Sequence, residues 1–194
     1  MQRIIALVIV LMLLAVPAFA KDNIYLAYQS SAIMPEDDNY GIGKAFYGQA
    51  VEVGWSLNKY LEIGAEYYLS KWKSVHASTF WDNSIMGTAK VKYTLPWKWC
   101  NRVTPYGVIG VGAHFFTGKD MKKDPDQPDT PWNYPETIAR DSCIALKYGG
   151  GIQYEVVKNV YLYTEIAYRY GDTGEPSSTD VYAWSYGGGV KIYF

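Results

Sequence analysis

The sequence predicts an all-β fold, an eight-stranded antiparallel up-and-down transmembrane β-barrel that follows an export segment. Three observations lead to this prediction. Segments of alternating apolar and polar residues follow one another through most of the chain, and long and short connections alternate between them. Tyr and Trp are abundant, with 19 and 7 residues. Because only alternate residues of a barrel strand face lipid, the mean hydropathy of −0.14 fits such a membrane protein.

The amino-terminal segment differs from the rest of the chain. Arg3 supplies a positive charge, an uncharged apolar run follows, and Ala18 and Ala20 are small residues at the −3 and −1 positions of a cleavage site. This pattern is typical of a secretory signal peptide. A membrane anchor is the alternative, but the apolar run is shorter than the ~20 residues that a spanning helix needs. We therefore expect a signal peptide at 1–20 and a single outer-membrane barrel domain at 21–194.

The strand segments have about the length that a tilted transmembrane strand requires. In chain order we expect strands at 24–32, 46–57, 60–72, 84–95, 104–116, 143–156, 160–170 and 181–194. Their alternation gives each strand an apolar face and a polar face. The apolar faces carry Val51, Val53, Trp55 and Leu57 in the second strand, Leu61, Ile63, Ala65, Tyr67 and Leu69 in the third, Ile85, Ala89, Val91 and Tyr93 in the fourth, Ile144, Leu146, Tyr148, Ile152 and Tyr154 in the sixth, Val160, Leu162, Thr164, Ile166, Tyr168 and Tyr170 in the seventh, and Tyr182, Trp184, Tyr186, Val190, Ile192 and Phe194 in the eighth.

The connections alternate in length, as they do in outer-membrane barrels. Long polar connections are expected at 33–45, 73–83, 117–142 and 171–180, and short ones at 58–59 and 157–159, with 96–103 intermediate. Aromatic residues in the long connections are candidates for contacts with an extracellular partner, or else pack onto the barrel rim. They are Phe80, Trp81, Trp132 and Tyr134.

The polar faces carry the charged residues of the strands. Export and the Tyr- and Trp-rich apolar faces indicate that the apolar faces contact lipid, where a charge would cost roughly 2–4 kcal/mol. The charged residues then point into the lumen. The predicted lumen network comprises Glu52, Glu62, Glu66, Glu155, Glu165, Lys90, Lys92, Lys147, Arg169 and Lys191. Because acids and bases are equal in number, we expect ion pairs and a lumen that is closed to solutes.

The last strand ends on an aromatic residue in a recurring pattern. Gly189, Ile192 and Phe194 of the closing segment resemble the carboxy-terminal signal by which the outer-membrane assembly machinery recognises its substrates. Pro105–Gly112 resembles the fifth-strand motif of the outer-membrane β-barrel domain family, which is related to opacity-type proteins and to the barrel of OmpA-type proteins. The segments 149–155 and 165–170 resemble the parts that follow it in that family.

This resemblance implies an eight-stranded monomeric barrel in the bacterial outer membrane. Lipid, lipopolysaccharide and the assembly machinery are then the expected partners, with an extracellular partner contacted by the loops. The family's functions vary from adhesion to envelope integrity, so the fold alone does not decide between them. The net charge of −1 gives no indication of a nucleic-acid partner.

The sequence shows no clear motif for catalysis or for metal binding. His114 lies on the inward face of the fifth strand, but Phe115 and Phe116 follow it, so it lacks the His-x-Ser arrangement of barrel deacylases. His76 has no ligand partner at a regular spacing. We therefore expect a non-enzymatic barrel without metal or cofactor. A lipid-modifying enzyme and a narrow pore remain alternatives.

The two cysteines are expected to stay unpaired within one chain. Counted from a periplasmic amino terminus, Cys100 falls in a periplasmic turn, within the connection 96–103, and Cys143 lies at the outer rim of the sixth strand. An apolar band of ~25 Å separates those levels, whereas a disulfide requires Cα atoms within ~7 Å.

Overall fold

The structure is a computed structural model of the 194-residue chain. It describes residues 23–35, 46–72, 77–93, 95–96, 102–121, 140–172 and 181–194. The predicted signal peptide, with Ala18 and Ala20, lies outside these ranges, so the division at residue 20 stays a prediction. His76, Cys100, Trp132 and Tyr134 also lie outside them.

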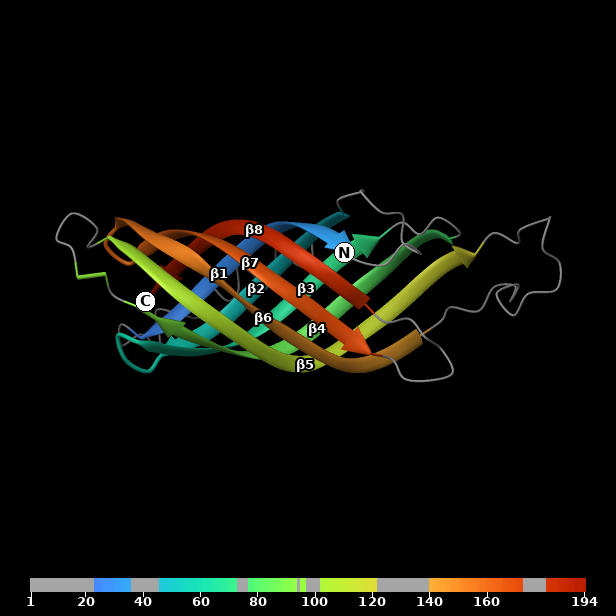
Figure 1. Ribbon diagram of the computed structural model, residues 1–194, viewed down its shortest axis with the longest axis horizontal. Helices are drawn as coiled ribbons and strands as arrows, with labels where there is room; N and C mark the ends of the chain where they lie inside the picture. The colour runs from blue at the N-terminus through green and yellow to red at the C-terminus, as the bar shows by residue number, and fades with distance from the viewer. Residues whose placement is uncertain are drawn as a thin grey trace.

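Eight antiparallel strands form one closed barrel, in which each strand pairs with its neighbours in sequence and the last strand pairs with the first. The strands are β1 (Ile24–Pro35), β2 (Phe46–Ser56), β3 (Leu61–Trp72), β4 (Ala77–Lys92), β5 (Val103–Met121), β6 (Arg140–Val157), β7 (Val160–Asp172) and β8 (Val181–Tyr193). They run obliquely along the long axis of the barrel (Figure 1). The predicted fold class is confirmed. In the ranges described, no helix is long and apolar enough to cross a membrane.

The predicted alternation decides which residues face inward. In β7, Tyr163, Glu165 and Arg169 are buried, whereas Leu162 and Ile166 on the other face are each 51% exposed. A soluble barrel would bury its apolar face and expose its charges. The opposite arrangement here is that of a barrel surrounded by lipid.

Two short connections show how the chain reverses. The side-chain oxygen of Asn58 accepts hydrogen bonds from the backbone N–H groups of Tyr60 (2.8 Å) and Leu61 (2.9 Å), which holds the turn between β2 and β3. Between β6 and β7, Asn159 adopts a φ of 67°, a left-handed conformation that asparagine tolerates better than most residues. We call the end that carries these connections the turn end, and the other the loop end.

Five strands, β1, β4, β5, β6 and β7, extend further toward the loop end than the sequence predicts, and β4 and β5 extend the most. β4 begins at Ala77 and β5 continues to Met121, with Ala77 paired to Met121. Phe80 and Trp81, which were expected in a loop, therefore belong to β4, and the predicted loops 73–83 and 117–142 are shorter than expected. The prediction failed because backbone pairing continues into segments where polar residues on both faces remove the alternation.

The interior contains two apolar clusters at different heights. The cluster nearer the turn end consists of Tyr25, Ala27, Tyr106, Val108 and Tyr163, with Tyr193 packed against it. The cluster nearer the loop end consists of Ile33, Ala50, Tyr68, Cys143 and Ala183. Ionised side chains occupy the lumen around them.

Candidate functional site

The charged lumen is the most unusual feature of the barrel. Nine of the ten charged residues proposed from the sequence are buried there and take part in ion pairs. They are Glu52, Glu62, Glu66, Glu165, Lys90, Lys92, Lys147, Arg169 and Lys191. The tenth, Glu155, is half-buried at the turn end, outside the ion pairs that the described residues form. Ordinary soluble domains rarely bury charged side chains, and then only as pairs.

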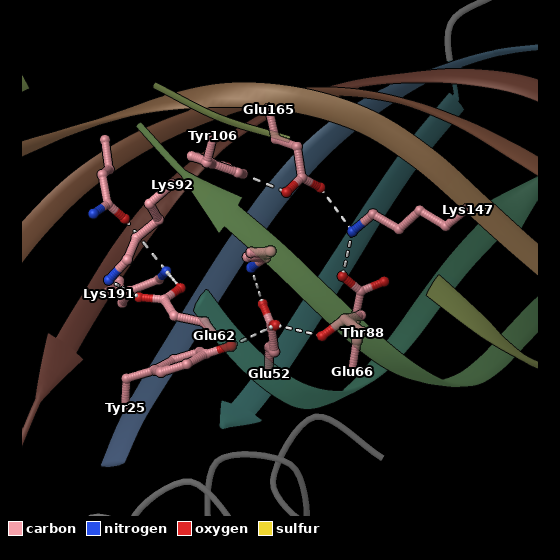
Figure 2. Close-up of polar contacts among 12 residues, drawn as sticks. Tyr25, Glu52, Glu62, Glu66, Thr88, Lys92, Tyr106, Lys147, Glu165 and Lys191 are labelled. Atoms are coloured by element: carbon pink, nitrogen blue, oxygen red, sulfur yellow. Dashed lines mark hydrogen bonds and ion pairs between the residues drawn. The ribbon is translucent and has the colours of Figure 1, made fainter. Parts of the chain in front are cut away.

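The central cluster joins three strands across the lumen. Glu66 from β3 accepts hydrogen bonds from Lys147 Nζ of β6 at 2.6 Å and from Arg169 Nη2 of β7 at 2.7 Å. Lys147 Nζ also lies 2.7 Å from the carboxylate of Glu165, so it bridges two acids (Figure 2). Both oxygens of Glu66 are thereby neutralised by separate cations.

A second cluster is centred on Glu52 of β2. Its carboxylate accepts hydrogen bonds from Tyr25 Oη at 2.8 Å and Thr88 Oγ1 at 2.7 Å, and it forms an ion pair with Lys90 (Figure 2). Tyr25 and Thr88 belong to the strands β1 and β4. Glu52 therefore connects three strands through one carboxylate.

The third cluster lies closest to the turn end. Glu62 receives Lys92 Nζ and Lys191 Nζ, each at 2.8 Å, and the hydroxyl of Tyr193 donates to the same carboxylate. Gln153 accepts a longer hydrogen bond of 3.4 Å from Lys191. Lys191 and Tyr193 belong to the last strand, so this cluster connects β8 to β3 across the lumen.

Aromatic rings surround the buried cations. Lys191 Nζ lies 4.5 Å from the ring centre of Tyr25, and Arg169 Cζ lies 3.7 Å from that of Tyr68. Ring faces are electronegative and attract cations within about 6 Å. These contacts compensate part of the lost hydration while the rings fill space that water would otherwise occupy.

The sequence analysis missed one acidic residue that is buried in the lumen, Asp82. Its Oδ1 lies 2.8 Å from Nδ1 of His114, and its Oδ2 accepts a hydrogen bond of 3.3 Å from Ser70. Asp82 was assigned to a loop, because β4 was expected to begin at Ser84. It does occupy the inward position two residues before Ser84, so a longer strand would have revealed it. With Asp82 replacing Glu155, acids and bases in the lumen remain equal in number.

The other predicted site residues have different surroundings. His114 is buried and faces the lumen as expected, and Cys143 is buried near the loop end. Cys100 is not described, so the absence of a disulfide stays a prediction. Gly189 and Ile192 lie in β8, and the backbone N–H of Phe194 donates to Ile24 at 2.9 Å, which extends the seam between β8 and β1. Within the described ranges, no group of three or more His, Cys, Asp or Glu residues is placed to hold a metal ion.

Three solved outer-membrane proteins have a fold similar to that of this chain. Neisserial surface protein A shares 16% identity over 88% of this chain and 97% of its own, with a TM-score of 0.66. OprG from Pseudomonas aeruginosa shares 10% over 90% and 97%, with a TM-score of 0.59. The attachment invasion locus protein Ail of Yersinia pestis, in complex with the heparin analogue sucrose octasulfate, shares 17% over 89% and 97%, with a TM-score of 0.50.

Sequence comparison identifies the family. No curated protein matches the chain at a significant level. The family model described as outer membrane protein beta-barrel domain matches residues 6–194, nearly the whole chain. Together with the closed barrel of eight strands and its lipid-facing apolar wall, this match shows that the protein is located in the bacterial outer membrane and belongs to the outer membrane protein beta-barrel domain family.

Proposed function

We propose that the protein is a non-enzymatic barrel whose closed body anchors surface-exposed connections, through which it contributes to adhesion, to envelope integrity, or to both. The observation that carries the proposal is the filled lumen. Ion pairs and tyrosine rings occupy it from the Glu62 cluster to the pair of Asp82 and His114. Such a body is suited to anchoring rather than to transport.

The distribution of charge also argues against a selective pore. Selective channels line their constriction with charges of one sign. Here every described carboxylate that is buried in the lumen contacts a cation or a histidine, and Glu66 and Glu62 each contact two cations. An ion entering the lumen would have to displace one of these contacts.

The pair of Asp82 and His114 has one feature of a catalytic site, because a carboxylate that accepts from Nδ1 orients a catalytic histidine. A general base must also reach its substrate. His114 is 0% exposed, with Ser84 and Cys143 as its inward-facing neighbours on β4 and β6. This burial supports a structural role, in which the pair closes the lumen near the loop end.

The adhesion part of the proposal comes from the long connections at the loop end. In outer-membrane barrels, the longer connections face the outside of the cell. The Yersinia protein of the same fold is named for attachment and invasion and was solved with a heparin analogue, so a barrel of this size can present a ligand-binding surface. The assembly machinery, lipid and lipopolysaccharide remain the partners expected inside the envelope.

The test uses a strain that lacks the gene, complemented with either the full chain or a chain whose residues 122–139 are replaced by a short Gly/Ser linker. We expect deletion to reduce surface adhesion and to increase detergent sensitivity. The linker variant should restore detergent resistance but not adhesion. If deletion changes neither property, the proposed function is wrong. If the linker variant restores adhesion fully, this connection is not the adhesive surface.

A further inference from the structure

One part of the lipid-facing wall gathers more polar groups than the rest. Four outward-facing residues of β1 and β2 form a hydrogen-bonded group, which we call the hydroxyl–amide cluster: Tyr28, Ser30, Tyr47 and Gln49. Gln49 Nε2 donates to Tyr47 Oη at 3.1 Å. The hydroxyl of Tyr47 also hydrogen-bonds with those of Ser30 and Tyr28.

The depth of this cluster follows from strand geometry. A tilted barrel strand gains about 2.5 Å of height per residue. Gln49 lies eight residues from Leu57 at the turn end, or roughly 20 Å above it, and Ser30 lies roughly 15 Å above Ile24. Since the apolar band is ~25 Å tall, both residues lie in its outer half.

The opposite wall shows what this depth normally contains. There the outward residues of β5, β6 and β7 at comparable heights include Val111, Tyr148, Ile166 and Tyr168, none of which carries an amide or an aliphatic hydroxyl. An amide and three hydroxyl groups in hydrocarbon are costly unless they have partners, and polar groups at such depths usually have a function. The cluster is therefore not explained by contact with acyl chains alone.

A cation lies beside the upper end of the cluster, next to Tyr47. Lys71 is the register partner of Tyr47 on β3, and its side chain is exposed on the same outer wall. Lys71 lies ten residues from Leu61, so it reaches roughly 25 Å, the outer boundary of the apolar band. Beside it, Tyr67 donates a hydrogen bond of 3.0 Å to Asn83, which adds an amide at nearly the same level.

We infer that this wall binds an outer-leaflet lipid that has a phosphorylated sugar headgroup and amide-linked, hydroxylated acyl chains. Lys71 lies where a headgroup phosphate would lie. Gln49 and Ser30 of the cluster lie below it, where amide and hydroxyl groups at the start of the acyl chains would enter the apolar band. A phospholipid such as phosphatidylglycerol matches the cation but has no amide or sugar for the cluster. This inference concerns the barrel wall and does not depend on the adhesive role proposed above.

The test measures lipid binding to the full-length purified barrel by native mass spectrometry, with lipid A and phosphatidylglycerol offered in equal amounts. The wild-type protein should retain lipid A in preference. The double variant Ser30→Ala, Gln49→Leu should bind lipid A roughly three- to tenfold more weakly, the range expected for losing one or two membrane hydrogen bonds. Lys71→Gln should weaken it about fivefold. The double variant should retain phosphatidylglycerol like the wild type. Lys71→Gln should lower phosphatidylglycerol retention only as much as the loss of one charge explains.

Two matched controls keep the test specific. Thr164→Val removes an exposed outward hydroxyl of β7, and Lys59→Gln removes an exposed cation at the turn end. Both controls should bind lipid A like the wild type, and heat-modified migration on gels should show that every variant is folded. Equal binding by all proteins, or equal losses in the controls, would overturn the inference. So would a cross-linked dimer that the double variant abolishes while lipid A binding is unchanged, because the surface would then join two copies of the chain.

Discussion

Glu66 shares its two carboxylate oxygens between cations from two other strands, Lys147 and Arg169. Its value to the barrel therefore depends on pairing and not on charge as such. A buried ion pair contributes little compared with an apolar replacement, but removing one partner leaves an uncompensated buried charge. At Glu66, neutralisation would leave two cations to share Glu165 in a site where all four side chains are buried.

We predict that Glu66→Gln destabilises the barrel by about 3–5 kcal/mol, less if water enters the lumen. The measurement is urea unfolding in lipid vesicles. Glu155→Gln is the matched control, since Glu155 is half-buried and outside the ion pairs described for the lumen. The control should change the free energy of unfolding by less than about 0.5 kcal/mol. Equal effects of the two substitutions would contradict the pairing argument.

The pair of Asp82 and His114 gives a second residue-scale prediction. A double-mutant cycle with Asp82→Asn and His114→Gln should give a coupling energy of about 0.5–3 kcal/mol, because the side chains are in direct contact. The corresponding cycle between Asp82→Asn and Glu155→Gln should give no coupling, since these residues lie toward opposite ends of the barrel. A coupling near zero in the first cycle would mean that the contact does not stabilise the folded state.

Which residues face the lumen was easier to predict from the sequence than which of them contact one another. The inward position of Glu66 follows from alternation within β3 alone. Its contact with Lys147 and Arg169 depends on the register of strands far away in sequence and on side chains that reach across the lumen. No local pattern contains that information. Asp82 was missed for a different reason, because the apolar face that would mark its strand stops before it.

At the scale of the element, local alternation predicts the centres of the strands better than their ends. Within the apolar band, lipid on one side and the lumen on the other impose alternation, so all eight strands were located from the sequence. Beyond the band, both faces of β4 and β5 carry polar residues, and the backbone pairing continues from Trp81 to Ala77. The alternation pattern therefore could not predict that β4 and β5 continue beyond the apolar band.

Inward glycines allow tyrosine rings to fill the lumen, and one pair of sites tests this. A Cβ added at Gly54 would lie 2.4 Å from the carbonyl oxygen of Ile63 and 2.5 Å from the ring of Tyr25. Gly54→Ala should therefore destabilise the barrel by about 1–3 kcal/mol through overpacking. Gly87→Ala is the control, because its Cβ would face outward with its nearest neighbour 3.8 Å away. Unfolding in vesicles should leave the control unchanged or slightly stabilised, and the reverse order would refute the packing argument.

The last strand has a prediction of its own, that assembly depends on Phe194. Deleting it leaves Tyr193, whose ring faces inward to Glu62, at the end of the chain, and also removes the hydrogen bond from Phe194 N–H to Ile24. We expect less folded protein in the outer membrane, as measured by fractionation and heat-modified migration. Phe194→Tyr keeps both the aromatic ring and the backbone bond and should assemble normally. Normal assembly of the deletion would count against a carboxy-terminal signal in this chain.

At the scale of the whole molecule, the lumen clusters act as cross-braces. Each connects strands that are not neighbours in the barrel, such as β3 with β6 and β7, or β3 with β8. Backbone pairing holds adjacent strands together, whereas these contacts limit how far the cross-section can deform. Because each of the acids Glu52, Glu62 and Glu66 contacts at least one base, these contacts add rigidity without leaving their charges unpaired.

This bracing leads to the last prediction, that the purified wild-type barrel carries no steady current in planar bilayers. An eight-stranded barrel encloses a space that side chains can just fill. Here Tyr25, Tyr68 and Met86 are among the buried lumen residues, each about 1% exposed or less. A permeating ion would have to separate Glu66 from Lys147 or pass the ring of Tyr68, which Arg169 covers at 3.7 Å. Glu66→Gln weakens the contact between residue 66 and Lys147 but leaves the ring of Tyr68 in the lumen. This variant should therefore produce at most brief channel openings. A reproducible open-channel current from the wild-type protein would refute the closed lumen, and the body of the barrel would then have to be understood as a pore with mobile ion pairs.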